Sequence, residues 1–111
     1  MKNKKVCVIG GGRWGKNHLN TLNQLGSLYG LVEQNLDSIE YYKKIYPNIM
    51  YFTKVEDAIN HGFDGYVVAT PAETHYSIGK KIIESNKNIN SYLLLYFWCN
   101  SWVNHFYAFL E

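Results

Sequence analysis

The sequence predicts an α/β domain in which helices cover both faces of a parallel sheet. Short apolar runs alternate with segments of helical periodicity, and three consecutive glycines follow the first apolar run. A chain that adds parallel strands must cross back over the sheet each time, and a helix is the usual crossover. The fold class that we expect is therefore a doubly wound parallel sheet.

The first unit is a strand, a glycine turn and a helix. Residues 6–9 are Val-Cys-Val-Ile and end at the glycines, which is typical of a buried parallel strand. Leu19, Leu22 and Leu25 follow at helical spacing, and Gly26 is a suitable helix end.

A second strand and helix and a third strand follow. Residues 28–32 form an apolar run, after which Asn35 can cap a helix that ends before Pro47. Residues 49–52 predict the third, short strand.

The third helix and a fourth unit complete the alternation. Thr53 and Glu56 have the order of a capping box, with Thr53 at the cap, for a short helix that ends near Gly62. Residues 66–69 form a fourth buried strand, and the helix after it runs to about Asn86.

The composition bounds the class of protein. The 111 residues suffice for one domain, and the net charge of +2 comes from interspersed residues, so nucleic acid is not an expected partner. The apolar run at residues 6–9 is too short for the core of a signal peptide. Cys7 and Cys99 provide neither metal-ligand spacing nor a disulfide framework, so we expect no metal and a reducing, cytoplasmic location.

Gly10, Gly12 and Gly15 fit the pattern G-x-G-x-x-G, in which backbone approaches the pyrophosphate of a dinucleotide. A flexible glycine loop would give the same spacing by chance. The strand before the motif and the helix after it are, however, the flanks that it requires, and the helix N-terminus favours phosphate. The sequence thus predicts a Rossmann-type dinucleotide-binding domain.

Glu33 stands roughly 20 residues further on, at the end of the second strand, where a carboxylate can accept both hydroxyl protons of the adenosine ribose. A solvated loop carboxylate is the alternative. Gln34 and Asn35 follow it, so no adjacent cation would receive a 2′-phosphate, and NAD is expected rather than NADP. Within the glycine turn, Arg13 can reach the pyrophosphate, and Trp14 either walls the cleft or packs the first helix on the sheet.

A second cluster follows the fourth strand, at the sheet edge that also carries the glycine turn. Pro71 after Thr70 ends the strand, Thr74 can cap the next helix, and His75 is a first-turn residue. The residues alone leave a binding role and a structural role equally open for His75.

These segments together resemble the N-terminal domain of the Gfo/Idh/MocA oxidoreductases, over residues 5 to about 89. The matching pieces are residues 8–17, 32–33, 63–71 with His75, and 82–87. The Arg-Trp-Gly-Lys-Asn sequence at residues 13–17 is most similar to a branch that oxidises a ring hydroxyl of nucleotide-linked sugars.

The resemblance implies that the domain binds NAD or NADP, with Thr70, Pro71 and His75 lining the cleft near the cofactor. It also implies hydride transfer between a sugar carbon and the nicotinamide, and homo-oligomers, which family members often form. The family's catalytic lysine lies in a Glu-Lys-Pro motif after the fifth strand, which aligns with residues 92–94, and no lysine follows Lys87. We therefore predict no catalytic residue and no substrate domain in this chain.

Residues 90–111 differ from the rest of the chain. No charged residue lies between Lys87 and Glu111, and eight aromatic residues lie between Tyr92 and Phe109. We expect a Rossmann domain at residues 1–89 and an aberrant hydrophobic tail at 90–111, with a frameshift or premature stop as the preferred explanation. A membrane-associated segment, disfavoured by central polar residues, and a fifth strand built from residues 93–95 are the alternatives.

Three functions agree with this sequence. The preferred one is an NAD-binding domain of an oxidoreductase that is catalytically incomplete. In the second, another chain provides the lysine and the substrate domain. The third is a nucleotide-sensing Rossmann module without catalysis.

Overall fold

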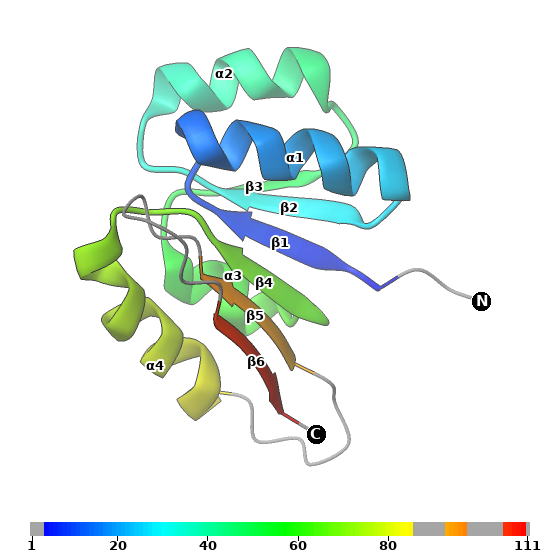
Figure 1. Cartoon of the computed structure of the whole chain (residues 1–111). Coiled ribbons are helices and arrows are strands. Elements are labelled where there is room, and N and C mark those ends of the chain that lie inside the picture. Colours follow the sequence, from blue (N-terminus) through cyan, green and yellow to red (C-terminus); the bar gives the residue numbers. More distant parts are fainter. Residues whose placement is uncertain (1–3, 86–92, 98–105, 111) are drawn as a thin grey trace.

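The computed structural model describes residues 4–85, 93–97 and 106–110, along which strands and helices alternate (Figure 1). The strands are β1 (Val6–Ile9), β2 (Leu28–Val32), β3 (Met50–Phe52), β4 (Gly65–Val68), β5 (Leu93–Phe97) and β6 (Phe106–Leu110). The helices are α1 (Arg13–Leu25), α2 (Leu36–Ile45), α3 (Val55–His61) and α4 (His75–Ser85), with a short 3₁₀ helix, η1 (Ala72–Thr74), before α4. The predicted α/β class is confirmed.

The described strands form one sheet in the order β3-β2-β1-β4-β5-β6. β1 pairs in parallel with both β2 and β4, and β5 extends the parallel sheet beside β4, whereas β6 runs antiparallel to β5. The strand order reverses between β1 and β4, because β2 and β3 lie on one side of β1 and the later strands lie on the other. In open α/β sheets, ligands bind at such a point, beyond the carboxyl ends of the strands.

The position of β5 agrees with the alternative in which residues 93–95 supply a fifth strand. Leu93 and Leu94, with which the Glu-Lys-Pro motif aligns, lie inside β5. The residues directly after β5, 98–105, lie outside the described part of the chain. The division at residue 89 and the frameshift stay predictions. Within the described residues, no helix has the length and apolar character needed to cross a bilayer.

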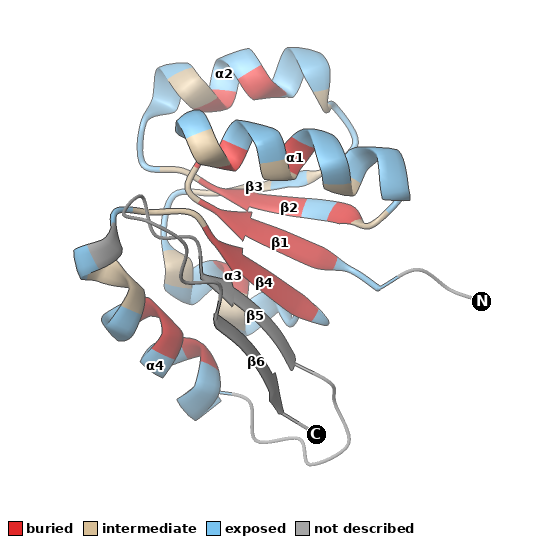
Figure 2. Cartoon of the chain, in the orientation of Figure 1, coloured by how far each residue is buried: buried red, intermediate tan, exposed pale blue. Residues whose placement is uncertain are grey.

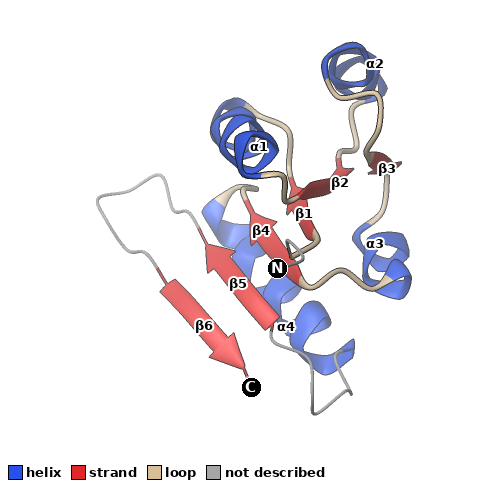
Figure 3. Cartoon of the chain, turned by 90° about the vertical axis from the view of Figure 1, so that its right-hand side faces the viewer, coloured by secondary structure: helices blue, strands red, loops and turns tan. Residues whose placement is uncertain are grey.

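Helices cover both faces of the sheet, with α1 and α2 on one face and α3 and α4 on the other (Figure 3). Successive side chains of a strand point to opposite faces. Val6 and Val8 accordingly pack with Leu19 of α1, whereas Cys7 and Ile9 join the core beneath α3 and α4. All of β1 is buried (Figure 2), as predicted for a central parallel strand.

The predicted ends of the first two helices are confirmed. Gly26 ends α1 in the left-handed conformation, with φ at 73°. Asn35 caps α2, because its side-chain oxygen accepts a hydrogen bond from the Asp37 N–H at 2.9 Å.

The predicted capping box of the third helix is wrong. The cap of α3 is Lys54 rather than Thr53, and no side-chain hydrogen bond caps the helix within the described residues. Since the helix begins one residue later than predicted, Glu56 falls at its second position and cannot close the box. Its carboxylate instead accepts a hydrogen bond from Lys81 of α4 at 2.8 Å.

A pair of leucines tests the core. Leu31, in β2, has no exposed surface, whereas Leu36, on α2, is 66% exposed. We expect Leu31→Ala to lower the free energy of unfolding by about 2–5 kcal/mol, because it removes buried methyl groups and leaves a cavity. Leu36→Ala makes the same chemical change and should cost less than about 0.5 kcal/mol. Urea unfolding followed by circular dichroism measures both, and equal losses would contradict the assigned core.

Candidate functional site

The chain leaves β1 through a tight bend at Gly10. Its φ is 103°, a conformation that glycine adopts without strain, and a Cβ there would lie 3.0 Å from the carbonyl oxygen of Ala69. Gly15 lies in the first turn of α1, where a Cβ would overlap the Gly10 carbonyl oxygen. Helix α1 can therefore begin directly against the bend because both residues are glycine.

Gly12 is the N-cap residue of α1 and faces open space. A Cβ added to it would meet no described atom within 4 Å, and no described side chain caps this helix end. The first turn of α1 carries no acidic residue. With its backbone N–H groups and the positive end of the helix dipole, this end of the helix suits an anion such as phosphate.

Glu33 follows β2 and is held against the glycine turn. One carboxylate oxygen accepts a hydrogen bond from the Gly11 N–H at 2.6 Å, and the other accepts one from the Asn35 N–H at 3.1 Å. The half-buried side chain is thus a partnered group rather than the solvated loop carboxylate of the alternative. Each carboxylate oxygen can accept two hydrogen bonds, so each keeps an acceptor site for a ligand.

Tyr42 of α2 contacts the same turn. Its hydroxyl donates a hydrogen bond to the Gly11 carbonyl oxygen at 2.8 Å. Burial, followed by the neighbouring Tyr41 and Glu33, raises the pKa of Tyr42, which keeps the donated proton in place. The sequence around Tyr42 contains no signal for this polar contact.

Side chains in and next to the loop after β4 form hydrogen bonds within that loop. Thr74 Oγ1 lies 2.6 Å from both Thr70 Oγ1 and the Pro71 carbonyl oxygen. His75 Nε2 lies 2.7 Å from the Thr70 carbonyl oxygen, and since a carbonyl only accepts, Nε2 carries the proton. His75 is the first residue of α4, as predicted, and Thr74 directly precedes the helix.

The glycine turn, Glu33 and the loop after β4 border one cleft of about 490 Å³. This volume lies within the range of roughly 300–1,000 Å³ that is usual for small-molecule sites. Its walls combine apolar side chains from the strands and from α3 and α4 with a few polar groups. The lining residues are Ile9, Gly10, Gly11, Gly12, Val32, Glu33, Gln34, Thr53, Val55, Ala69, Thr70, Pro71, Thr74 and Ile78.

The structure brings five of the nine predicted site residues together on this cleft: Gly10, Gly12, Glu33, Thr70 and Pro71. The other four, Arg13, Trp14, Gly15 and His75, are not among the described residues that line it.

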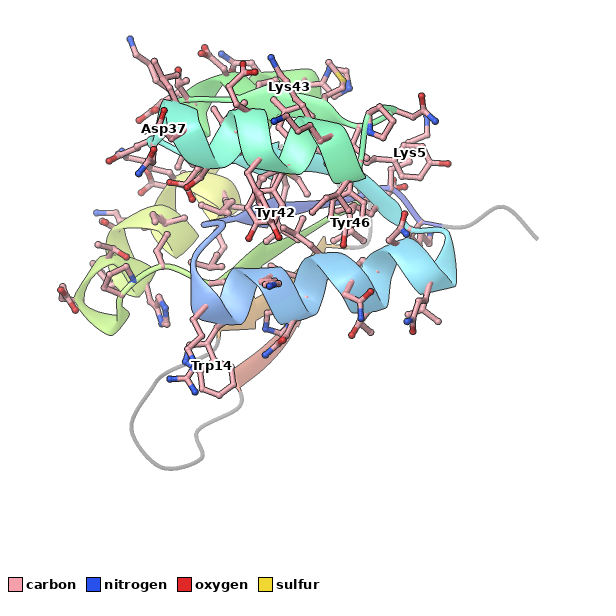
Figure 4. The ribbon with its side chains drawn as sticks, turned by 90° about the horizontal axis from the view of Figure 1, so that it is seen from above. Lys5, Trp14, Asp37, Tyr42, Lys43 and Tyr46 are labelled. Carbon is pink, nitrogen blue, oxygen red and sulfur yellow. The ribbon has the colours of Figure 1, made fainter. Side chains whose placement is uncertain are left out.

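The positions of these four residues are as follows. Gly15 packs behind the turn, and His75 bonds to the backbone of the cleft wall. Arg13 is the exposed first residue of α1. Trp14 lies on the side of α1 that is turned away from α2 (Figure 4).

Sequence reasoning missed several lining residues. Gln34 was considered only for its lack of charge, and Thr53 was expected to cap α3. Val55 and Ile78 belong to helices that follow two different strands, and the sequence near them does not indicate a cleft. No local pattern would have joined them, because the sheet brings the strand ends together.

The residues present fit a dinucleotide. The open face of Gly12 at the start of α1 offers room and backbone donors for a phosphate, and Glu33 offers free acceptor sites at the edge of the cleft. The apolar walls suit a flat ring. The fold and the cleft define a dinucleotide-binding α/β domain of the Rossmann type.

The chain belongs to the Gfo/Idh/MocA oxidoreductases. Residues 4–91 match the model of this family, which is described as an oxidoreductase family with an NAD-binding Rossmann fold. The family resemblance inferred from the sequence is thereby confirmed. A comparison with curated protein sequences gave no match.

Solved dehydrogenase structures share the fold. The WlbA dehydrogenase from Bordetella pertussis, in complex with NADH and UDP-GlcNAcA, superposes with a TM-score of 0.72 at 19% identity, over 85% of this chain and 28% of that chain. A UDP-N-acetylglucosamine 3-dehydrogenase from Acidithiobacillus ferrooxidans has a TM-score of 0.69 at 19% identity, over 86% and 30%. The scyllo-inositol dehydrogenase from Lactobacillus casei, with bound NAD(H) and scyllo-inositol, has a TM-score of 0.72 at 17% identity, over 86% and 28%. The chain thus spans less than one third of the length of these proteins.

Alanine substitutions at Gly15 and Gly12 distinguish a glycine that packs closely against backbone from one that faces open space. Gly15→Ala places a methyl group against the Gly10 carbonyl oxygen and should lower the free energy of unfolding by about 1–3 kcal/mol. Gly12→Ala points into open space and should cost less, about 0.5–1 kcal/mol, because alanine is a poorer N-cap than glycine. Thermal and urea unfolding of both variants measure the difference. The assigned turn geometry fails if Gly12→Ala is the more destabilised protein.

Proposed function

We propose that this chain binds NAD in the cleft, in preference to NADP, and is the cofactor-binding N-terminal part of a dehydrogenase acting on sugars or nucleotide-linked sugars. The observation that carries the proposal is the convergence of the open glycine turn, the Glu33 carboxylate and the Thr70-Pro71 loop on one cleft. Family membership supports NAD as the cofactor.

The glycine turn is the proposed site of the pyrophosphate. Gly12 leaves space for close approach, and the start of α1 supplies backbone donors and the positive end of the helix dipole. Arg13, exposed at the first position of α1, is long enough to add a charged contact from the rim. Trp14 would border the same end of the cofactor.

Glu33 is the proposed acceptor for the hydroxyl groups of the adenosine ribose. Its two carboxylate oxygens each keep one acceptor site beyond their bonds to Gly11 and Asn35. A 2′-phosphate in the same place would be repelled by this charge, and Gln34 beside it in the cleft offers no cation. These groups support a preference for NAD over NADP.

The loop after β4 is the proposed boundary of the nicotinamide half of the cleft. Thr70 and Pro71 line the cleft, while His75 holds the Thr70 carbonyl oxygen in place. When bound, the nicotinamide accepts or donates a hydride. Thr70 and Pro71 would bind the nicotinamide ring and orient it in the cleft.

The substrate class rests on similar structures. Proteins of this fold include enzymes crystallised with a nucleotide-linked sugar and with an inositol, both of which carry oxidisable ring hydroxyls. Residues that contact the substrate and a catalytic lysine are proposed to lie outside this domain. A homo-oligomeric state stays a prediction.

A cytoplasmic location is also part of the proposal. Cys7 is a free, fully buried thiol, and burial raises its pKa, so it stays a protonated thiol within the core. A reducing compartment suits such a residue.

Cofactor titration tests the proposal directly. We expect purified protein to bind NAD more tightly than NADP, as measured by isothermal titration calorimetry. Glu33→Gln keeps the side-chain size and an acceptor oxygen but removes the charge. It should weaken NAD binding by about tenfold and narrow the preference over NADP, because it replaces charge-assisted hydrogen bonds.

Gly12→Val serves as the companion variant in this titration. Its side chain enters the space proposed for the pyrophosphate, so NAD binding should be lost while the fold is kept. Equal and weak binding of NAD by the unaltered chain, Glu33→Gln and Gly12→Val would refute the cofactor site.

A further inference from the structure

We propose that Tyr42 is a positioning residue for cofactor binding: its hydroxyl fixes the Gly11 peptide so that the Gly12 N–H faces the pyrophosphate site. The inference rests on the proposed NAD-binding function. Tyr42 does not belong to the glycine pattern and is not among the described residues that line the cleft.

Both polar backbone groups of Gly11 are held by side chains. The Tyr42 hydroxyl donates to the Gly11 carbonyl oxygen at 2.8 Å, and the Gly11 N–H donates to a Glu33 carboxylate oxygen at 2.6 Å. The two side chains come from different elements, Tyr42 from α2 and Glu33 from the end of β2. The middle residue of the turn is therefore fixed in orientation from two directions.

Because the peptide bond is planar, the orientation of the Gly11 carbonyl also sets the orientation of the Gly12 N–H. In a trans peptide, the C=O of one residue and the N–H of the next point in opposite directions, and the described residues contain no cis peptide. A Gly11 carbonyl that points to Tyr42 therefore turns the Gly12 N–H away from Tyr42. Tyr42 belongs to the core beneath α1 and α2, whereas Gly12 borders the cleft.

The tyrosine ring is itself held firmly. Tyr42 is 4% exposed, stacks on Tyr46 with ring centroids 6.4 Å apart, and meets Tyr41 edge-on at 5.2 Å. Figure 4 places Tyr42 and Tyr46 between α2 and α1. Because the ring is already fixed, the hydroxyl loses little side-chain entropy when it donates its hydrogen bond. A flexible side chain would lose more.

The same ring accounts for the middle glycine of the run, Gly11. A Cβ on Gly11 would lie 3.0 Å from the Tyr42 ring and 2.9 Å from the Glu33 carboxylate oxygen. Glycine at this position lets both side chains approach the turn closely. Within this run, Gly10 forms the bend, the backbone of Gly11 is held by two side chains, and Gly12 faces open space.

Tyr42→Phe keeps the ring and removes the hydroxyl, and Tyr51→Phe is its matched control. Tyr51 donates a similar hydrogen bond, 2.6 Å to the Tyr46 carbonyl oxygen, at a site away from the turn. We expect Tyr42→Phe to weaken NAD binding by about three- to tenfold and Tyr51→Phe by less than about twofold, although both lose one hydrogen bond. Isothermal titration calorimetry measures the affinities, and thermal unfolding of the same samples reports stability.

A ligand without phosphate distinguishes a specific effect of Tyr42 on the Gly12 N–H from a general loss of structure in the variant. Adenosine, titrated by NMR, should bind Tyr42→Phe within about twofold of the unaltered chain, because it does not reach the Gly12 N–H. Amide spectra of ¹⁵N-glycine-labelled protein should show changes at Gly11 and Gly12 in Tyr42→Phe but not in Tyr51→Phe. If Tyr42→Phe melts below the assay temperature, sucrose restores the folded population for the titration.

The outcomes distinguish the inference from the function on which it rests. An unaltered chain that does not bind NAD overturns both. NAD binding that is equal in the unaltered chain and Tyr42→Phe overturns the positioning role alone, as does a loss of NAD affinity that Tyr51→Phe reproduces.

Discussion

The geometry of the site depends on the close contact between Gly15 of α1 and the carbonyl oxygen of Gly10. Any side chain at Gly15 would push α1 away from the turn and move its N-terminus from the edge where β1, β2 and β4 end. The turn is also tied to β2, since the Gly10 N–H donates to the Val32 carbonyl oxygen at 2.8 Å. A displaced helix would therefore disturb the position of Glu33, which follows Val32, as well as the proposed phosphate site.

Around this contact, side chains that would serve a ligand also serve the fold. Glu33 faces the cleft and also accepts the Gly11 N–H, so its removal changes the turn as well as the ligand contact. His75, by contrast, does not line the cleft but hydrogen-bonds to the Thr70 carbonyl oxygen, which belongs to the cleft wall. Glu33, Tyr42 and His75 each hydrogen-bond to backbone that borders the cleft.

The fold of this chain also occurs in solved dehydrogenase structures. Solved structures that share the fold, at 17–19% identity, include enzymes crystallised with different substrates. What they share with this chain is the fold of the α/β domain. A shared fold does not set the substrate, because function depends on the particular residues of a site.

The sequence by itself determined the alternation of strands and helices, the glycine turn and the Asn35 cap, because these depend on periodicity and on residues close together in the chain. Thr53 was misplaced at the cap of α3 because the start of a short helix also depends on what packs around it. The sequence also predicted that the Thr70-Pro71 loop shares a sheet edge with the glycine turn, but only the tertiary structure showed that His75 and Gly15 do not line the cleft. It also decided the contact of Tyr42 with Gly11, because only the packing of α2 beside the turn brings these two residues together.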